Sequence, residues 1–142
     1  MPRDYSSLPV IVFDIETGPR ADAAQFAPEF EAPANYKDPV KIAAYRAEKM
    51  TEWVKSAALS AVTGQVLAIG VREDGRTEIF CSDDEAKMLF SFWDYVSTDG
   101  AIRARMVGFY SNRFDVPFLV RRSWRLGVPV PRGIISGRYL ND

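Results

Sequence analysis

The chain has 142 residues, of which 47% are hydrophobic, and its 18 basic and 19 acidic residues give a formal net charge of −1. This length predicts one domain, residues 1–142, and the apolar fraction excludes general disorder. The near-balance of charge excludes a global basic field, so any affinity for nucleic acid has to be local. The single cysteine excludes an internal disulfide. No apolar run approaches the ~20 residues that span a bilayer, so we expect a cytoplasmic protein with no membrane partner.

The first predicted element is a strand at about residues 10–15 that runs into two carboxylates, Asp14 and Glu16. Side chains alternate along a strand, so this spacing places both carboxylates on one face. Two neighbouring anions repel each other unless a cation lies between them, and hard divalent cations such as Mg²⁺ or Mn²⁺ prefer oxygen ligands. The pattern therefore indicates a metal site at the strand end. The alternative is an edge strand that runs into a solvated acidic turn.

A long insertion at about residues 20–60 follows the first strand. Residues 20–36 are rich in Ala, Pro and acidic residues and are expected to form an irregular loop. Asp38 is predicted to cap a helix that begins at Pro39 and runs to about Ala58. We favour a helix that packs over the sheet, and the alternative is a lid or DNA-contacting arm near the metal site.

Two strands and a helix follow the insertion. Residues 65–72 and 77–81 are predicted to pair as an antiparallel hairpin, because the Asp-Gly pair between them favours a tight turn. Ser82 or Asp83 is predicted to cap the next helix, which ends near residues 98–100. The apolar stripe of this helix is interpreted as core and not as a cofactor site. Its members are Met88, Leu89, Phe92, Trp93 and Val96.

The last predicted strand and helix bring in a third carboxylate. A strand at about residues 105–110 precedes Asp115, and a helix from about Val116 to Leu126 follows it, with Gly127 at its C′ position. Asp115 is expected at the N-terminus of this helix as an N-cap, a role that does not exclude metal binding.

The order of these elements predicts a mixed α/β sheet with flanking helices. An antiparallel hairpin joins parallel strands through a helical crossover, so the first and last strands should be neighbours. The carboxylates of Asp14, Glu16 and Asp115 would then converge at one edge of the central strands. Such a set suits a two-metal site, with cations ~3.5–4 Å apart.

Two motifs in this order resemble those of a known superfamily. The sequence FDIET at residues 13–17 and the sequence FDVPFL at residues 114–119 resemble the first and second motifs of the DEDD-type 3′–5′ exonucleases. The resemblance is to the proofreading domain of family-B DNA polymerases and to the stand-alone exonucleases similar to it. Residues 58–71 also resemble the second-strand segment of those stand-alone proteins, and the likeness covers about residues 8–128.

The resemblance implies a ribonuclease-H-like fold and a metal-dependent 3′–5′ exonuclease that hydrolyses terminal phosphodiesters of single-stranded DNA, with RNA as an alternative substrate. It implies two Mg²⁺ or Mn²⁺ ions, with Asp14 bridging both and Glu16 and Asp115 each holding one. It also implies contacts to the terminal nucleotide, for which the matching positions are Ile15, Thr17, Tyr110, Asn112 and Phe114. Phe114 and Tyr110 have core packing as their alternative role.

The sequence departs from the superfamily pattern at two places. Tyr110 occupies the position where the superfamily usually has an Asn, and the nearby Asn is Asn112. The third motif supplies a fourth carboxylate and a Tyr or His base, but this chain has no His, and Tyr139 and Asp142 are one residue too close together. We therefore expect a C-terminally incomplete domain that a missing segment or a partner chain completes.

Two further alternatives remain open. In the first, the chain is a catalytically inactive or truncated exonuclease-like module that binds nucleic acid or a partner. Four arginines are candidate phosphate contacts, and for those of the last helix the alternative is a solvated helix face. They are Arg113, Arg121, Arg122 and Arg125.

Overall fold

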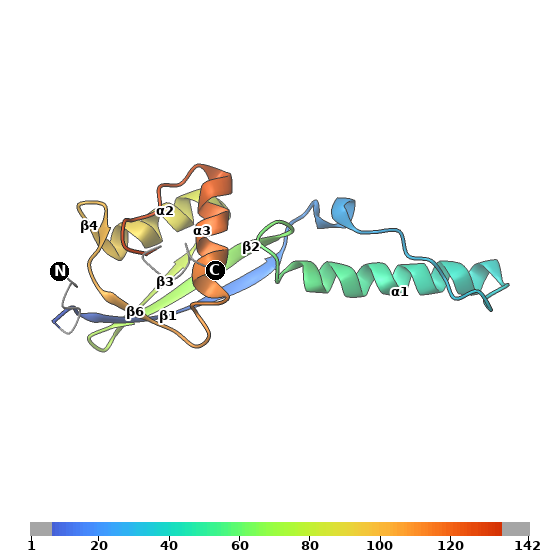
Figure 1. The fold of residues 1–142 in the computed structure, drawn as a ribbon, viewed down its shortest axis with the longest axis horizontal. Coiled ribbons are helices and arrows are strands. Elements are labelled where there is room, and N and C mark those ends of the chain that lie inside the picture. The colour runs from blue at the N-terminus through green and yellow to red at the C-terminus, as the bar shows by residue number, and fades with distance from the viewer. Residues whose placement is uncertain (1–6, 135–142) are drawn as a thin grey trace. The chain divides into compact units, whose positions relative to one another are not determined.

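A computed structural model describes residues 7–134, and its contacts divide the chain into two compact units. The sheet unit is made by the parts of the chain before Thr17 and after Gln65, and the arm unit is Thr17–Gln65. Figure 1 draws both units, and each is described here by itself. The arm unit coincides with the insertion expected at about residues 20–60, and the single domain of residues 1–142 stays a prediction.

The sheet unit contains a four-stranded mixed sheet in the order β3-β2-β1-β6. β1 and β6 are parallel, with Val10 opposite Arg105 and Val12 opposite Val107. β2 and β3 are antiparallel, as the hairpin signal predicted. The strands are β1 Val10–Pro19, β2 Gly64–Glu73, β3 Arg76–Cys81 and β6 Arg105–Val107.

Two helices of the sheet unit, α2 (Glu85–Tyr95) and α3 (Asp115–Leu126), lie over one face of this sheet (Figure 1). The expected fold, a mixed α/β sheet with flanking helices compatible with the ribonuclease-H-like class, is therefore confirmed. The adjacency of the first and last long strands of the sheet is also confirmed. In this arrangement the second carboxylate motif follows the strand that pairs directly with β1.

The core lies between the sheet and these helices, and Phe92 is at its centre. Phe92 is fully buried, and its ring centroid lies 6.2 Å from that of Phe13, 5.9 Å from that of Phe80 and 4.9 Å from that of Trp93. Aromatic pairs at such separations add to the stabilisation that burial provides. The predicted apolar stripe of α2 is buried throughout: Met88, Leu89, Phe92, Trp93 and Val96.

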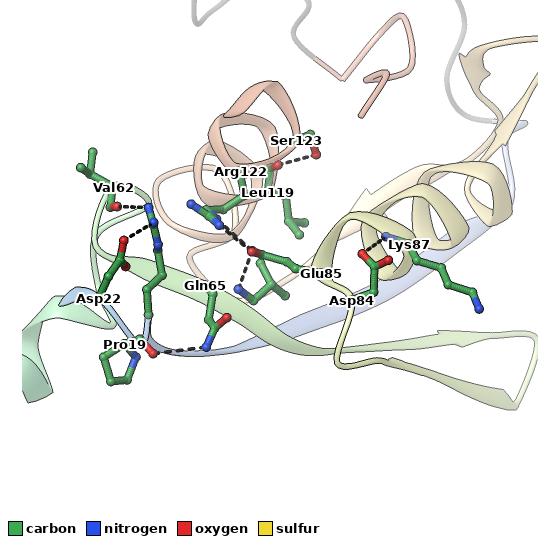
Figure 2. A network of polar contacts seen from close by, with 12 residues as sticks. Pro19, Asp22, Val62, Gln65, Asp84, Glu85, Lys87, Leu119, Arg122 and Ser123 are labelled. Atoms are coloured by element: carbon green, nitrogen blue, oxygen red, sulfur yellow. Dashed lines mark hydrogen bonds and ion pairs between the residues drawn. The ribbon is translucent and has the colours of Figure 1, made fainter. Parts of the chain in front are cut away.

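A buried ion pair joins α2 to α3 (Figure 2). Arg122 donates from Nε and Nη2 to the two carboxylate oxygens of Glu85, at 2.9 and 2.5 Å. The backbone N–H of Val66, in β2, donates to the same carboxylate at 2.9 Å. Only 4% of the Arg122 side chain and 11% of the Glu85 side chain is exposed. The expectation that Arg122 contacts phosphate or lies on a solvated face is therefore wrong, because Glu85 neutralises it inside the protein.

The N-cap of α2 lies two residues after Ser82 and one residue after Asp83, the two predicted caps. Asp84 is the N-cap, and its carboxylate accepts the backbone N–H of Lys87 at 3.0 Å. Ser82 instead accepts the N–H of Asp84 at 3.1 Å. Three successive residues can all cap a helix, and the start that the structure adopts is the one that directs Glu85 toward Arg122.

The segment after α2 differs from the predicted helix end near residues 98–100. The helix ends at Tyr95, and β4 (Ser97–Thr98) pairs with β5 (Ala101–Ile102) in a small hairpin. Asp99 and Gly100 both have positive φ, of 52° and 70°. The Asp-Gly pair of the β2–β3 hairpin has the same backbone signs, which are those of a type I′ turn. The second Asp-Gly pair thus forms a turn with the same residues and the same signs of φ as the first.

The arm unit contains one short and one long helix. The 3₁₀ helix η1 (Ala23–Phe26) lies within the segment that was expected to be irregular. The helix α1 is Pro39–Ala57, and Asp38 caps it by accepting the N–H of Val40 at 2.9 Å, as predicted. Of the residues of α1, only Ala57 is buried. The packing and lid interpretations of this segment both stay predictions.

No helix within residues 7–134 combines the length and the apolar character that a bilayer crossing requires.

A second polar network links the end of β2 to the segment after α2. Arg103 binds both carboxylate oxygens of Glu73, at 2.7 and 2.9 Å, and donates from Nε to the Tyr95 carbonyl at 2.9 Å. The Tyr95 hydroxyl donates to Glu73 at 2.9 Å. The hydrogen bonds from Arg103 are the main reason that the pKa of Glu73 falls to about 2. Bidentate pairs of this kind stabilise the ionised carboxylate.

This network predicts a specific acid sensitivity. The lowered pKa of Glu73 means that its contribution to stability is present above its ordinary pKa of 4.5 and is lost as the pH falls toward 2. Glu73→Gln should lower the free energy of unfolding by about 1–2 kcal/mol at pH 7, and by much less near pH 2. Thermal unfolding between pH 7 and pH 2 measures this, with the exposed Glu78→Gln as the control. An equal stability loss for Glu73→Gln at both pH values would contradict the prediction.

Candidate active site

Asp14 and Glu16 lie on the exposed face of β1. Ile11, Phe13 and Ile15 alternate with them and are buried, which leaves the two carboxylates on the side of the strand away from the core. The spacing of the sequence motif therefore produces the expected shared face.

The turn after β6 approaches β1 closely at Gly108. A Cβ atom on Gly108 would lie 2.9 Å from the Phe13 carbonyl oxygen and 2.8 Å from the Ser111 Cβ, so no other residue fits without movement. Because Val107 is opposite Val12, this contact continues the β1–β6 register by one residue. The turn is thereby held against β1 next to Asp14.

Backbone hydrogen bonds fix the remainder of this turn. The Tyr110 carbonyl accepts the N–H groups of Arg113 and Phe114, at 3.0 and 3.2 Å, and the Ser111 carbonyl accepts the N–H of Val116 at 2.9 Å. Tyr110 has a φ of 56°, which ends the extended backbone. The strand predicted over residues 105–110 therefore stops at Val107.

Asp115 is the first residue of α3 and is only 4% exposed. The N-cap position belongs to Phe114, so the predicted cap at Asp115 is wrong by one residue. The backbone N–H groups of Asp115 itself and of Ile15 in β1 nevertheless act on the Asp115 carboxyl by lowering its pKa. The side chain at the start of α3 is thus influenced by the carboxylate-bearing strand.

The charge of Asp14 acts on the Asp115 carboxyl. The pKa of Asp115 is raised, first by burial and then by the negative charge of Asp14, while the two backbone N–H donors oppose the rise. Burial and the charge of a second carboxylate both disfavour the ionised form of Asp115. A bound cation would offset both of these costs.

The remaining predicted site residues are distributed differently. Ile15 is buried, and its N–H is used by Asp115, while Thr17 is half-buried and belongs to the arm unit. Asn112 is exposed in the turn. Phe114 is half-buried, with its ring centroid 5.5 Å from that of Phe118, so it packs against the core while keeping an open side.

Two neighbouring aromatic side chains of the same turn are exposed. Tyr110 is 66% exposed, so the alternative that it fills the core is wrong. Phe109 is 96% exposed and was not among the predicted site residues. The signal that could have revealed it is the position of two aromatics between Gly108 and the polar pair Ser111-Asn112, where turn residues gather.

The fit of this site to a divalent cation rests on two carboxylates. Within residues 7–134, no group of three or more His, Cys, Asp or Glu side chains is arranged to hold a metal ion. Mg²⁺ binds through one or two carboxylates together with waters and substrate phosphates, so Asp14 and Asp115 fit such an ion. The metal role of Glu16 stays a prediction, and Tyr139 and Asp142 lie outside the described residues.

Comparison with solved structures gives weak likenesses, one of which is described here. No known protein family matches the chain, and no curated protein matches it. A family B DNA polymerase from the hyperthermophilic archaeon Pyrobaculum calidifontis is similar over 87% of this chain, with 24% sequence identity and a TM-score of 0.49. The chain spans only about 12% of the length of that polymerase. A likeness of this size supports no statement about activity.

Proposed function

We propose that the chain is a metal-dependent 3′–5′ exonuclease that hydrolyses terminal phosphodiesters of single-stranded DNA. The observation that supports this proposal best is the electrostatic coupling of Asp14 and Asp115, in which the charge of an exposed carboxylate adds to burial in raising the pKa of a buried one. The choice of a DNA 3′ end rests on the resemblance of the two motifs. A nucleic-acid-related role is the coarser form of the same proposal.

Each residue of the proposed site has a defined task. Asp14 and Asp115 would hold Mg²⁺ or Mn²⁺, with Glu16 as a further ligand from the same strand face, and a second ion would join on substrate binding. When bound, such ions act as Lewis acids and lower the pKa of bound water. The N–H groups of Ile15 and Asp115 lower the pKa of the Asp115 carboxyl and so favour its ionised form, which is the form that binds a cation.

The alternative is an exonuclease-like module that binds nucleic acid without turnover. It is favoured by the fact that no three-carboxylate group is arranged around a metal position in the part of the chain between residues 7 and 134. The two proposals differ in one result, the release of nucleotides.

The test is nucleotide release from a 5′-labelled single-stranded oligonucleotide with Mn²⁺ or Mg²⁺. The wild type should give a shortening ladder that chelator removes. Asp14→Ala should slow release by at least about 100-fold, because the loss of a direct ligand exceeds the 10- to 100-fold typical of outer-shell partners. The exposed Asp94→Ala, on α2, is the matched control and should keep full activity. A folded wild type without a ladder would reject the exonuclease and leave the binding module.

A further inference from the structure

The turn between β6 and α3 presents two adjacent aromatic rings to solvent, Phe109 at 96% and Tyr110 at 66% exposure. A single exposed apolar residue is ordinary on a protein surface. Two consecutive rings without burial are different, because each forgoes the stabilisation that a core position would give. The pair is therefore a candidate contact surface.

The backbone at Tyr110 supports the same conclusion. Its φ of 56° is in the left-handed region, which glycine and asparagine adopt at low energetic cost and which is disfavoured for a bulky side chain. Two hydrogen bonds to the Tyr110 carbonyl hold this conformation, at 3.0 and 3.2 Å. Unfavourable backbone that the surrounding structure enforces is found preferentially at ligand sites. The rings are thus presented by a fixed turn and not by a loose loop.

The position of the turn connects the rings to the carboxylate pair. Gly108, which directly precedes Phe109, packs against the carbonyl of Phe13, the neighbour of Asp14. At the other end of the turn, Asp115 begins α3, and its carboxyl is influenced by the Ile15 N–H of β1 and by the charge of Asp14. The turn that carries the two rings therefore begins against the neighbour of Asp14 and ends at Asp115. Arg113 is an exposed cation in the same turn.

We propose that Phe109 and Tyr110 form a stacking site for an unpaired base of the nucleic acid whose 3′ end is bound at Asp14 and Asp115. The proposal deepens the proposed function and rests on it. Every nucleobase has a π-face, so stacking accepts any sequence, as a nuclease that shortens a strand stepwise requires. A base inside a duplex cannot stack in this way, so the site selects single-stranded ends. Arg113 is placed to meet a neighbouring phosphate.

The test compares two probes in Mg²⁺, each with non-hydrolysable linkages at its 3′ end, so that no cleavage occurs. One is a 5′-fluorescein-labelled oligo(dT), and the other is the same strand with abasic residues at its 3′ end. Fluorescence anisotropy should give wild-type protein about 10-fold tighter binding to oligo(dT), and Phe109→Ala should remove this preference without changing the affinity for the abasic strand. Phe90→Ala, which removes a ring that is 57% exposed on α2, is the matched control and should behave as wild type.

A second variant separates stacking from folding. Tyr110→Gly removes the ring and also suits the positive φ, so it should raise the melting temperature while it weakens binding to oligo(dT). Unchanged binding by both Phe109→Ala and Tyr110→Gly would overturn the stacking site, as would equal affinity of the wild type for the two probes.

The outcomes also distinguish this proposal from the proposed function. A wild type that gives a nucleotide ladder but shows no preference for bases retains the exonuclease and rejects the stacking site. A wild type that prefers oligo(dT) through Phe109 but gives no ladder supports the stacking site and rejects the exonuclease. A protein that neither binds nor cleaves the probes overturns both.

Discussion

Asp115→Asn is expected to slow nucleotide release by about 1,000-fold while leaving the protein as stable as the wild type, or more stable, at pH 7. The loss of activity follows because an amide no longer balances the charge of a divalent cation. Such a cation contributes several kcal/mol to charge stabilisation, and about 4 kcal/mol corresponds to this factor. Asp115 has no neighbour on its own helix that could replace it, whereas Asp14 has Glu16 on the same strand face.

The effect on stability follows from the direction of the pKa shift. Burial, and then the charge of Asp14, raise the pKa of Asp115 above its ordinary value of 3.8. The contribution of Asp115 to stability is therefore complete below that value and is lost as the pH rises through the raised pKa. Asn carries no charge, and its side-chain oxygen can still accept the N–H of Ile15. The advantage of the Asn variant should accordingly grow from pH 3 to pH 7.

Melting curves with and without Mn²⁺ separate the two roles of this residue. Saturating metal should raise the melting temperature of the wild type, because a ligand at 100 times its Kd stabilises by about 2.7 kcal/mol. The Asn variant should show no such rise, and the exposed Asp94→Asn should respond as the wild type does. An Asn variant that is stabilised by Mn²⁺ to the same extent as the wild type would remove Asp115 from the metal site.

Arg122→Ala should lower the free energy of unfolding by about 3–5 kcal/mol, the largest stability effect that we predict. Removing one partner of a buried ion pair leaves the other charge without compensation, and only 11% of the Glu85 side chain is exposed. The remaining hydrogen bond, from the Val66 N–H, does not balance a full negative charge. The damage should therefore spread to the contacts of α2 with both β2 and α3.

Urea unfolding at pH 7 measures this effect, with Lys49→Ala as the matched control. Lys49 forms a 2.7 Å pair with Glu52, but both side chains are at least 36% exposed, so its loss should change stability little. Combining Arg122→Met with Glu85→Gln should recover part of the loss, since Gln can still accept the Val66 N–H. If Arg122→Ala and Lys49→Ala have the same midpoint, the Glu85–Arg122 pair does not stabilise the fold as proposed.

Local sequence patterns were sufficient to predict a residue's role where that role depends on its immediate neighbours in the chain. The alternation on β1 defined both the strand and the face that carries Asp14 and Glu16, and Asp38-Pro39 defined the start of α1. The position of the second motif beside the first also followed from the order of the elements, because β6 is parallel to β1.

Roles that depend on distant residues could not be predicted in this way. Arg122 is on the buried side of α3 because Glu85, 37 residues earlier, neutralises it, and no periodicity within α3 reveals that partner. The β-prone run after Arg105 was predicted to continue to Tyr110. The strand instead stops at Val107, and Gly108 packs against Phe13, almost a hundred residues earlier. Phe109 lies in the turn that follows, and its position was missed because the run was predicted to be a strand.

The closeness of Gly108 to β1 also has a consequence for how this protein tolerates mutation. Even Ala would place a carbon atom 2.9 Å from the Phe13 carbonyl, and the turn would have to shift by several tenths of an ångström. Phe13 adjoins Asp14, and the turn leads into Asp115, so we expect that shift to move the two carboxylates relative to each other. The geometry of this site therefore depends on a residue that has no side chain. In a library of random variants, substitutions at position 108 should give proteins that fold but are inactive.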